Sequence, residues 1–296
     1  MKEKRLLFAF PHPDDESLGP GGTIAKYARE GVEVHYVCAT RGEVGSVESQ
    51  MLKPYAHLAP DQQVGALREQ ELRNAADILG LTGVHHLDYR DSGMTGWQAN
   101  KDPRAFINAD PVRVTGQLVK IIRLYQPQVI VTFDPFGGYG HPDHIFIHQR
   151  TTEAFHAAGD QSRYPEAGRP YQPQKLYWTV CPKRLTRIFM VTARLTLRSL
   201  WKYGRNKDID TATHDYPATT LIDIGPYYDI KQQAWRCHAS QFSQFSQFSA
   251  WPSPFGKFQK FFESYETFRL VEPDSTGKRV IENDLFEGVA VSVSGT

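Results

Sequence analysis

A short apolar run followed at once by charged side chains constrains this chain more than any other feature. Residues 5–10 (RLLFAF) are short and apolar enough to form a buried parallel strand. The next six residues, 11–16 (PHPDDE), hold one imidazole and three carboxylates. Because ligands of open α/β sheets bind at the carboxyl ends of strands, this placement predicts a functional site. A helix cap would account for one acceptor in this loop, but not for four ionisable groups.

Composition and charge exclude several classes of function. The chain has 296 residues, of which 40% are hydrophobic and 23% charged, as is usual for a globular enzyme. A formal net charge of +1 provides no field for nucleic acid, so we expect no nucleic-acid partner. The three cysteines, Cys38, Cys181 and Cys237, are far apart and fit reduced thiols in a cytoplasmic protein. The apolar run that ends at Phe10 is too short for a signal sequence or a membrane span.

Strand and helix patterns alternate along the first half of the chain. We expect strands at residues 5–10, 32–39, 84–88 and 128–133, and helices at 23–30, 61–79, 111 to about 125, and 144 to about 159. Weaker patterns predict later strands at 176–181, 219–223 and 267–271 and a helix at 226–238. This order predicts an α/β, Rossmann-like fold with a mostly parallel sheet, helices on both faces and a C-terminal elaboration. We expect one domain over 1–296, with a core at about 1–180 and the elaboration at about 181–296.

The glycine-rich turn at residues 19–22 (GPGG) lies between a predicted strand and a predicted helix, which raises the question of dinucleotide binding. That fingerprint requires a glycine at position 24 and an acidic residue at the end of the second strand. Ile24 stands at the first position, and Thr40 and Arg41 stand at the second. The sequence therefore gives little support to a nucleotide site of this type.

A second polar loop follows the fourth predicted strand. Residues 137–144 (GGYGHPDH) leave the strand at 128–133 and lead into a helix. In a doubly wound sheet with right-handed crossovers, the third strand lies outside the second, and the fourth returns beside the first. His12 and His144 then flank the switch point, although 132 positions separate them. The central prediction is that the two loops meet at one crevice.

Histidine and aspartate side chains on these loops suit a catalytic metal ion. Two imidazoles and a carboxylate, from His12, His144 and Asp15, with the remaining positions left to water, are typical of catalytic zinc. Such a metal lowers the pKa of bound water to roughly 7 and polarises a carbonyl oxygen. Asp14 could accept the proton of the water, and His141 could protonate a leaving amine or hold the oxyanion. Fe²⁺ could replace Zn²⁺ in a reducing cytosol, because this ligand set suits both.

The motifs HPDDE at 12–16 and HPDH at 141–144 together resemble those of the PIG-L/LmbE-like zinc deacetylases, which remove an acetyl group from substrates that contain N-acetylglucosamine. The resemblance covers roughly residues 5–180 and returns near 231–241. It extends through further matching stretches: LRE and EL within 67–72, RDSGM at 90–94 and GGYG at 137–140. The last two look most like the branch that acts in thiol-cofactor metabolism, which includes the mycothiol-pathway deacetylase and the mycothiol-conjugate amidase.

The resemblance implies a role for each matching side chain. It implies three metal ligands: His12, Asp15 and His144. Asp14 would be the general base, and His141 would be the protonated partner of the tetrahedral intermediate, tuned by Asp143. Tyr139 would help to polarise the amide carbonyl. Two further positions match residues that hold sugar hydroxyls: Arg68 and Asp91. The implied reaction is hydrolysis of an acetamide on a small amino-sugar substrate, whose aglycone stays open.

Three alternatives remain open from the sequence. His238 lies in the returning stretch of resemblance and either lines the site or is a satisfied structural histidine. The same machinery could act as an amidase on a larger amino-sugar thiol conjugate. A protein of the same fold could also bind a sugar or nucleotide without turnover, although a pure binder has no need of a base beside an open metal.

Two stretches depart from what the resemblance explains. Residues 183–207 contain eight basic and no acidic side chains among apolar ones. This pattern favours a helix packed on the domain with its charges outward over a helix that lies on an anionic membrane. Residues 241–249 repeat Gln-Phe-Ser three times and would form either an aromatic lid over a hydrophobic aglycone or part of the C-terminal core. The sequence predicts no oligomeric state.

Overall fold

The computed structural model describes residues 3–180, 216–241, 264–274 and 281–290. Within these residues, seven strands form one sheet in the order β3-β2-β1-β4-β5-β7-β6. The strands are β1 (Arg5–Phe10), β2 (Glu33–Thr40), β3 (Gly83–Tyr89), β4 (Val129–Phe133), β5 (Lys175–Thr179), β6 (Thr220–Asp223) and β7 (Tyr265–Glu272). The first five run parallel, and β7 runs antiparallel to both β5 and β6. The prediction of an α/β fold with a mostly parallel sheet is confirmed.

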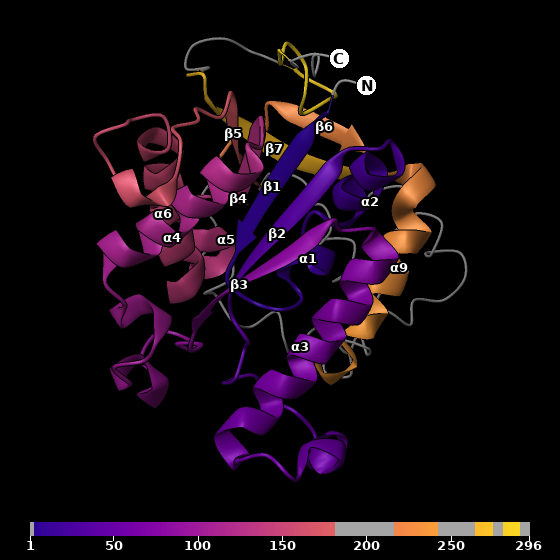
Figure 1. Ribbon diagram of the computed structural model, residues 1–296. Helices are drawn as coiled ribbons and strands as arrows, with labels where there is room; N and C mark the ends of the chain where they lie inside the picture. The colour runs from indigo at the N-terminus through magenta and orange to yellow at the C-terminus, as the bar shows by residue number, and fades with distance from the viewer. Residues whose placement is uncertain (1–2, 181–215, 242–263, 275–280, 291–296) are drawn as a thin grey trace.

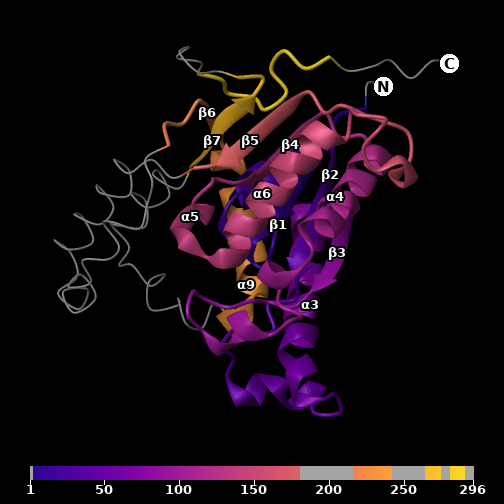
Figure 2. The same cartoon turned by 90° about the vertical axis from the view of Figure 1, so that its left-hand side faces the viewer.

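Helices cover both faces of this sheet. The α-helices are α1 (Asp15–Leu18), α2 (Gly21–Arg29), α3 (Pro60–Leu79), α4 (Pro111–Tyr125), α5 (Gly137–Gly140), α6 (Pro142–Ala157) and α9 (Tyr228–Cys237). Short 3₁₀ helices are η1 (Ser49–Tyr55), η2 (Gln98–Lys101), η3 (Phe106–Asn108), η4 (Pro165–Ala167) and η7 (Gly225–Tyr227). Figure 1 shows α2, α3 and α9 on one side of the sheet and α4 and α6 on the other. In the view of Figure 2, α4 and α6 lie in front of the strands.

The alternation of side chains along β1 divides the core into two layers. Leu6, Phe8 and Phe10 are fully buried against residues of α2, α3 and α9. Leu7 and Ala9 point to the opposite face and are buried against α4 and α6. Full burial of a Leu or Phe side chain stabilises the fold by about 1.5–3 kcal/mol. A strand buried on both faces is therefore why β1 reads as a continuous apolar run.

Most predicted elements occur within a few residues of their expected positions. The segment between β2 and α3, for which no helix or strand was predicted, contains the 3₁₀ helix η1 at Ser49–Tyr55. Helix α3 begins at Pro60 because proline suits the first helical turn. It ends at Gly80, whose φ of 80° is accessible to glycine. The basic stretch 183–207 and all but the first residue of the repeat at 241–249 lie outside the described residues.

The strand order places the loop after β1 directly beside the loop after β4. Strand β1 pairs in parallel with β4, with Leu6 opposite Val129 and Phe8 opposite Val131. Strand β2 lies on the other side of β1. Strands β2 and β3 are therefore added on one side of β1, and β4 is added on the opposite side. The predicted switch point is confirmed, and the two polar loops share one edge of the sheet.

The glycine-rich turn packs closely on a neighbouring side chain and binds the carboxylate of a distant residue of the same chain. Gly22 N and Thr23 N, at the start of α2, donate to the carboxylate of Glu266 at 2.9 and 2.8 Å. Lys231 Nζ also donates to Glu266, at 2.6 Å. A Cβ on Gly22 would lie 2.4 Å from the side chain of Ile224. The helix N-terminus, where a dinucleotide phosphate would bind, is therefore occupied by Glu266.

Candidate metal centre and active site

The loop after β1 is held in a tight turn by its own side chains. His12 N donates to Asp15 Oδ2 at 2.9 Å, and Tyr36 OH donates to the carbonyl of His12 at 2.9 Å. His12 and Asp15 are both buried. Asp14 adopts a φ of 114°, which residues with a side chain rarely adopt. The turn directs the side chains of His12 and Asp15 toward the facing loop.

His144 enters the same space from helix α6. Its ring stacks on Phe133 at the end of β4, with the ring centres 4.0 Å apart and the planes 13° apart. The ring nitrogen Nδ1 lies 3.1 Å from the carbonyl oxygen of Gly137. A Cβ on Gly137 would lie 2.6 Å from the Cβ of His144. A glycine is thus required where the loop passes close to this histidine.

The donor atoms of His12, His144 and Asp15 converge between the two loops. His12 Nδ1 lies 3.2 Å from His144 Nε2. Asp15 presents one oxygen to each ring, with Oδ2 3.5 Å from His12 Nδ1 and Oδ1 3.5 Å from His144 Nε2. Ligand atoms that lie about 2.0–2.1 Å from one tetrahedral zinc ion are roughly 3.3–3.4 Å from one another. The three side chains therefore have the spacing of ligands to one small divalent ion.

Outer hydrogen bonds determine which nitrogen of each ring faces this point. The carbonyl of Gly137 can only accept, so Nδ1 of His144 carries the proton and Nε2 has the lone pair. His12 Nε2 lies 3.2 Å from Asp143 Oδ2, so a neutral ring carries its proton on Nε2 and has its lone pair on Nδ1. Two lone pairs and a carboxylate thus face one point, an arrangement that fits a cation.

The electrostatic field around His12 also favours a positive charge. Burial alone would lower the pKa of His12, but Asp91, Asp143 and Asp15 raise it well above its usual value. Burial would likewise raise the pKa of Asp15, but His144 and His12 lower it to about 2. The carboxylate of Asp15 is therefore ionised at neutral pH and attracts a cation.

Wider groups of donors share His12 and His141. The donor atoms of His12, His141 and His144 lie within 4.8 Å of one another in the described residues, as do those of a second group: His12, Asp91, His141 and Asp143. In the second group, however, several of the atoms that could bind a metal already accept hydrogen bonds from backbone N–H groups. Asp91 accepts from Gly93 N at 2.8 Å, and His141 Nδ1 accepts from Asp143 N at 3.2 Å. A His/Asp group able to hold a metal ion is present, and its open lone pairs are on His12 and His144.

Asp14 stands next to this group and is paired with a buried arginine. Arg68 Nη2 donates to Asp14 Oδ2 at 2.9 Å and to the carbonyl of Pro13 at 2.6 Å, and Nη1 donates to the carbonyl of Gly42 at 2.9 Å. Burial raises the pKa of Asp14 to about 6, although the guanidinium of Arg68 acts to lower it. A carboxylate with a pKa near neutrality is suited to accept and return a proton.

His141 and Tyr139 lie on the other side of the group. Because Nδ1 of His141 accepts the N–H of Asp143, the neutral ring carries its proton on Nε2. Burial, together with the nearby rings of His12 and His144, lowers the pKa of His141 to about 3. The ring of Tyr139 is centred 5.0 Å from that of His144. With 53% of its surface exposed, Tyr139 lies at the rim of the site.

The carboxylate of Asp143 reaches across to the loop after β1. It was expected to tune His141. Its Oδ2 lies 3.2 Å from His12 Nε2 and accepts the N–H of Ser92 at 3.0 Å, and its charge also acts to raise the pKa of His141. Asp91, at the start of the loop after β3, also faces His12, with Oδ1 3.5 Å from Nε2.

His238 lies behind the catalytic loop. It is fully buried at the end of α9, and its Nε2 is 2.6 Å from Glu16 Oε1. Two other contacts near the site were not predicted from the sequence. Glu43 accepts the N–H of Asp91 at 3.0 Å, and Glu71 accepts the N–H of Ser240 at 2.7 Å. Glu71 lies in the stretch of family resemblance around Arg68, which was a usable signal, whereas nothing in the sequence singled out Glu43.

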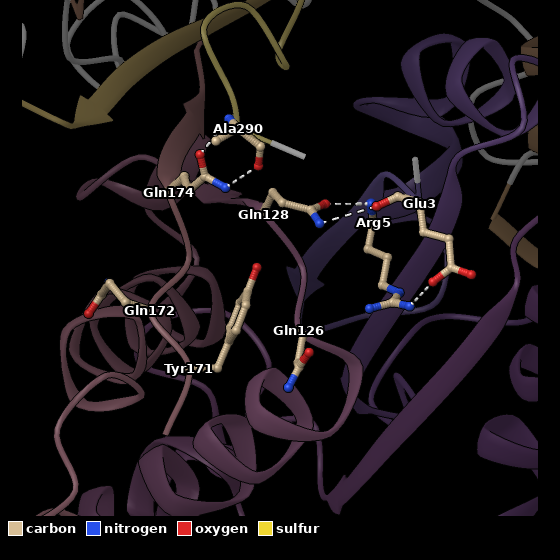
Figure 3. Close-up of a pocket in the computed structure, with 8 residues that line it drawn as sticks. All are labelled: Glu3, Arg5, Gln126, Gln128, Tyr171, Gln172, Gln174 and Ala290. Carbon is tan, nitrogen blue, oxygen red and sulfur yellow. Dashed lines mark hydrogen bonds and ion pairs between the residues drawn. The ribbon is translucent and has the colours of Figure 1, made fainter. Parts of the chain in front are cut away.

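A separate hollow of about 170 Å³ lies at the opposite end of the sheet, where β1, β4 and β5 begin (Figure 3). Its lining residues are Glu3, Arg5, Gln126, Gln128, Tyr171, Gln172, Gln174 and Ala290. The amide of Gln128 bonds to the backbone of Arg5, and that of Gln174 bonds in both directions to Ala290. The hollow contains none of the predicted site residues. The Gln128 amide ties the start of β4 to the start of β1, and the Gln174 amide ties the start of β5 to Ala290.

Comparison with known proteins identifies the family. The sequence model described as "PIG-L: GlcNAc-PI de-N-acetylase" matches residues 7–155, which include both polar loops. The chain belongs to the PIG-L family. It is therefore a hydrolase of the deacetylase class. In the described part of the chain, no helix is both long enough and apolar enough to cross a membrane.

Two relatives are similar in sequence to this PIG-L family member over most of its length. A protein of Rhodococcus jostii is 41% identical over 81% of this chain and 82% of its own length. A protein of Streptomyces avermitilis is 38% identical over 98% of this chain and 99% of its own length. Both bear the name 1D-myo-inositol 2-acetamido-2-deoxy-α-D-glucopyranoside deacetylase.

Solved structures with lower identity share the fold. N,N'-diacetylchitobiose deacetylase of Pyrococcus horikoshii is 22% identical, with a TM-score of 0.60 over 90% of this chain and 84% of its own. The 4-carboxy-2-hydroxymuconate hydratase of Pseudomonas putida is 21% identical, also with a TM-score of 0.60, over 93% of this chain and 99% of its own. A hydratase and a deacetylase thus share one fold, so the argument for function depends on the site.

Proposed function

We propose that this chain removes the acetyl group from 1D-myo-inositol 2-acetamido-2-deoxy-α-D-glucopyranoside, the compound named in its relatives. The observation that carries the proposal is the convergence of His12, Asp15 and His144 beside Asp14, whose pKa is close to neutrality. A general base beside an open metal position is an arrangement suited to amide hydrolysis. The deacetylase names of relatives that are 38–41% identical support the same conclusion.

We propose that the resident metal is Zn²⁺, bound by His12 Nδ1, His144 Nε2 and Asp15. Two imidazoles and a carboxylate with a remaining open position suit zinc, and in a reducing cytosol they also suit Fe²⁺. When bound, the ion would supply a water of lowered pKa and a Lewis acid for the acetamide carbonyl. Asp143 and Gly137 would fix the two rings through their outer nitrogens.

Asp14 would act as general base. Its carboxylate would accept a proton from the attacking water and then return that proton to the leaving amine. Arg68 is 4% exposed and already donates to Asp14, Pro13 and Gly42. We therefore propose that Arg68 acts by orienting Asp14, and we keep Asp91 as the residue that holds a sugar hydroxyl, as the family resemblance implies.

His141 would stabilise the developing oxyanion. The sequence left two roles open for it, as proton donor to the amine or as holder of the oxyanion. Its lowered pKa and its Nε2 proton favour the second role, because a neutral imidazole donates a hydrogen bond without losing its proton. Tyr139, at the rim, would help to polarise the same carbonyl.

The partner we propose is this small amino-sugar substrate alone. We also propose a cytoplasmic location, because the two described cysteines, Cys38 and Cys237, are free thiols of the kind that reducing compartments preserve. The amidase alternative and the non-catalytic alternative gain no support from any described contact, and both become outcomes of the test.

The test is acetate release from a panel of N-acetylated sugars. Zinc-loaded protein is incubated with GlcNAc-inositol, diacetylchitobiose, free GlcNAc and a larger amino-sugar thiol conjugate. We expect GlcNAc-inositol to give the highest kcat/KM. Cleavage of the conjugate alone would show that the protein is an amidase, and binding of GlcNAc-inositol without acetate release would show that it is a binding protein.

A further inference from the structure

The side chain of Glu16 lies beneath the catalytic loop and bonds to the backbone of Asp14. Both Glu16 and His238 have no exposed surface. Glu16 Oε2 accepts the N–H of Asp14 at 2.9 Å, and Oε1 accepts the hydroxyl of Ser17 at 2.6 Å. Glu16 is therefore a direct neighbour of the proposed base, although it does not face the metal ligands.

The backbone of Asp14 needs such support. Its φ of 114° and ψ of −26° lie outside the conformations that residues with a side chain normally adopt. Such conformations persist only where the surrounding structure determines them. The N–H of Asp14 is fixed by Glu16, and the preceding carbonyl, of Pro13, is fixed by Arg68 at 2.6 Å. Both polar groups of the peptide that precedes the Asp14 Cα are thus held by buried side chains.

His238 completes this support from the other end of the chain. It lies 222 positions after Glu16, at the end of α9, and its Nε2 is 2.6 Å from Glu16 Oε1. Within the described residues, its other ring nitrogen, Nδ1, is buried without a hydrogen-bond partner. The hydrogen bond with Glu16 therefore offsets the cost of burying the polar imidazole of His238.

We propose that Glu16 and His238 are positioning residues that hold Asp14 in its proton-accepting orientation. The proposal rests on the proposed function, because Asp14 is the base only if the chain hydrolyses an amide. His238 orients the Glu16 carboxylate through the 2.6 Å contact, and Glu16 fixes the Asp14 peptide. The C-terminal elaboration thereby contributes to catalysis through a residue that touches neither metal nor substrate.

The test compares His238→Leu with His238→Gln. Gln can place an N–H near the position of Nε2, whereas Leu has a similar size but no donor. Each variant is measured for kcat and KM with GlcNAc-inositol, for zinc per chain, and for hydrogen–deuterium exchange in residues 11–18. The matched control is His35→Leu, because His35 is a buried histidine on β2 that contacts His85 and Tyr125 rather than the site.

We expect His238→Leu to lower kcat at least 10-fold, to leave KM within about twofold, to retain zinc and to speed exchange in 11–18. His238→Gln should recover most of kcat and slow the exchange again. His35→Leu should change neither kcat nor the exchange in residues 11–18. A folded His238→Leu variant with normal kcat, or a Gln variant no better than Leu, would overturn the proposal.

A second variant covers the case in which His238→Leu does not fold. Glu16→Gln conserves the shape but leaves one acceptor oxygen for three donors, which come from Asp14, Ser17 and His238. Lower kcat with faster exchange in 11–18 is expected, and no change in either would overturn the proposal. If wild-type protein releases no acetate from any sugar, the proposed function fails, while the exchange data still decide whether the pair holds the loop.

Discussion

Replacement of Arg68 by methionine tests how the base is oriented. The Arg68 side chain is 5% exposed, and its guanidinium makes three hydrogen bonds, one of them to the Asp14 carboxylate at 2.9 Å. Arg68→Met keeps the length of the side chain but removes every donor. Breaking a buried ion pair from one side typically costs about 3–5 kcal/mol of unfolding free energy. The Asp14 side chain is 19% exposed, so water offsets part of this loss and we expect about 3 kcal/mol.

The loss of activity can be estimated from the same contact. Opposite charges about 4 Å apart interact by about 4 kcal/mol at an effective dielectric constant of about 20. If most of this interaction orients and ionises Asp14, kcat/KM at pH 7 should fall by about 10²–10³-fold. Arg68 lowers the pKa of Asp14, so without it that pKa rises above about 6. Because the base acts in its ionised form, the acidic limb of the kcat/KM profile should move to higher pH.

Arg41→Met is the matched control for this experiment. Arg41 lies on the loop after β2 and pairs with Glu69 and Asp88, away from Asp14. The assays are urea denaturation and acetate release across pH 5–9. We expect Arg41→Met to keep near-normal kcat/KM and an unmoved pH profile. If Arg68→Met lost no more activity than Arg41→Met, the account of Asp14 orientation would be wrong.

Three further predictions concern pH, a buried arginine and the metal. Burial would lower the pKa of His238, but Glu16 raises it. The pair therefore stabilises the fold below pH 6.5, and this stabilisation is lost as the pH rises through the raised pKa. The unfolding free energy that His238→Leu loses should accordingly become smaller in urea titrations from pH 5.5 to pH 9. Arg123 donates to six backbone carbonyls, so Arg123→Lys should cost at least ~2 kcal/mol by urea denaturation, whereas exposed Arg104→Lys should show no loss. Dialysis against a chelator should abolish acetate release and lower Tm by calorimetry, and one equivalent of Zn²⁺ should restore both; a chelated protein with full activity would contradict the metal assignment.

The sequence predicted those parts of the fold that local patterns encode. Buried parallel strands have continuous apolar runs, so β1, β2 and β4 were found from composition and length. The switch point followed from the order of strands and helices together with the handedness of crossovers. The sequence therefore predicted that His12 and His144 lie together, and Nδ1 of His12 is 3.2 Å from Nε2 of His144.

Contacts that depend on tertiary packing could not be predicted in this way. The antiparallel position of β7 between β5 and β6 depends on side-chain packing across the sheet, which no short pattern encodes. Glu266, which caps α2, lies more than 240 positions from the N–H groups it accepts. Asp143 was expected to tune His141, and the fold also brings its Oδ2 to 3.2 Å from Nε2 of His12 on the facing loop. Family resemblance drew attention to His238, but only the fold identifies Glu16 as its partner.

The most direct test of the central claim is acetate release by Asp14→Asn, with zinc content measured on the same sample. Asparagine keeps the shape of Asp14 but cannot accept the proton from water. With GlcNAc-inositol as substrate, we expect wild-type turnover and a loss of about 10²–10⁴-fold in kcat for the variant, at about one zinc per chain in both. Normal turnover by the zinc-loaded variant would show that Asp14 is not the base, and the mechanism proposed for this chain would have to be abandoned.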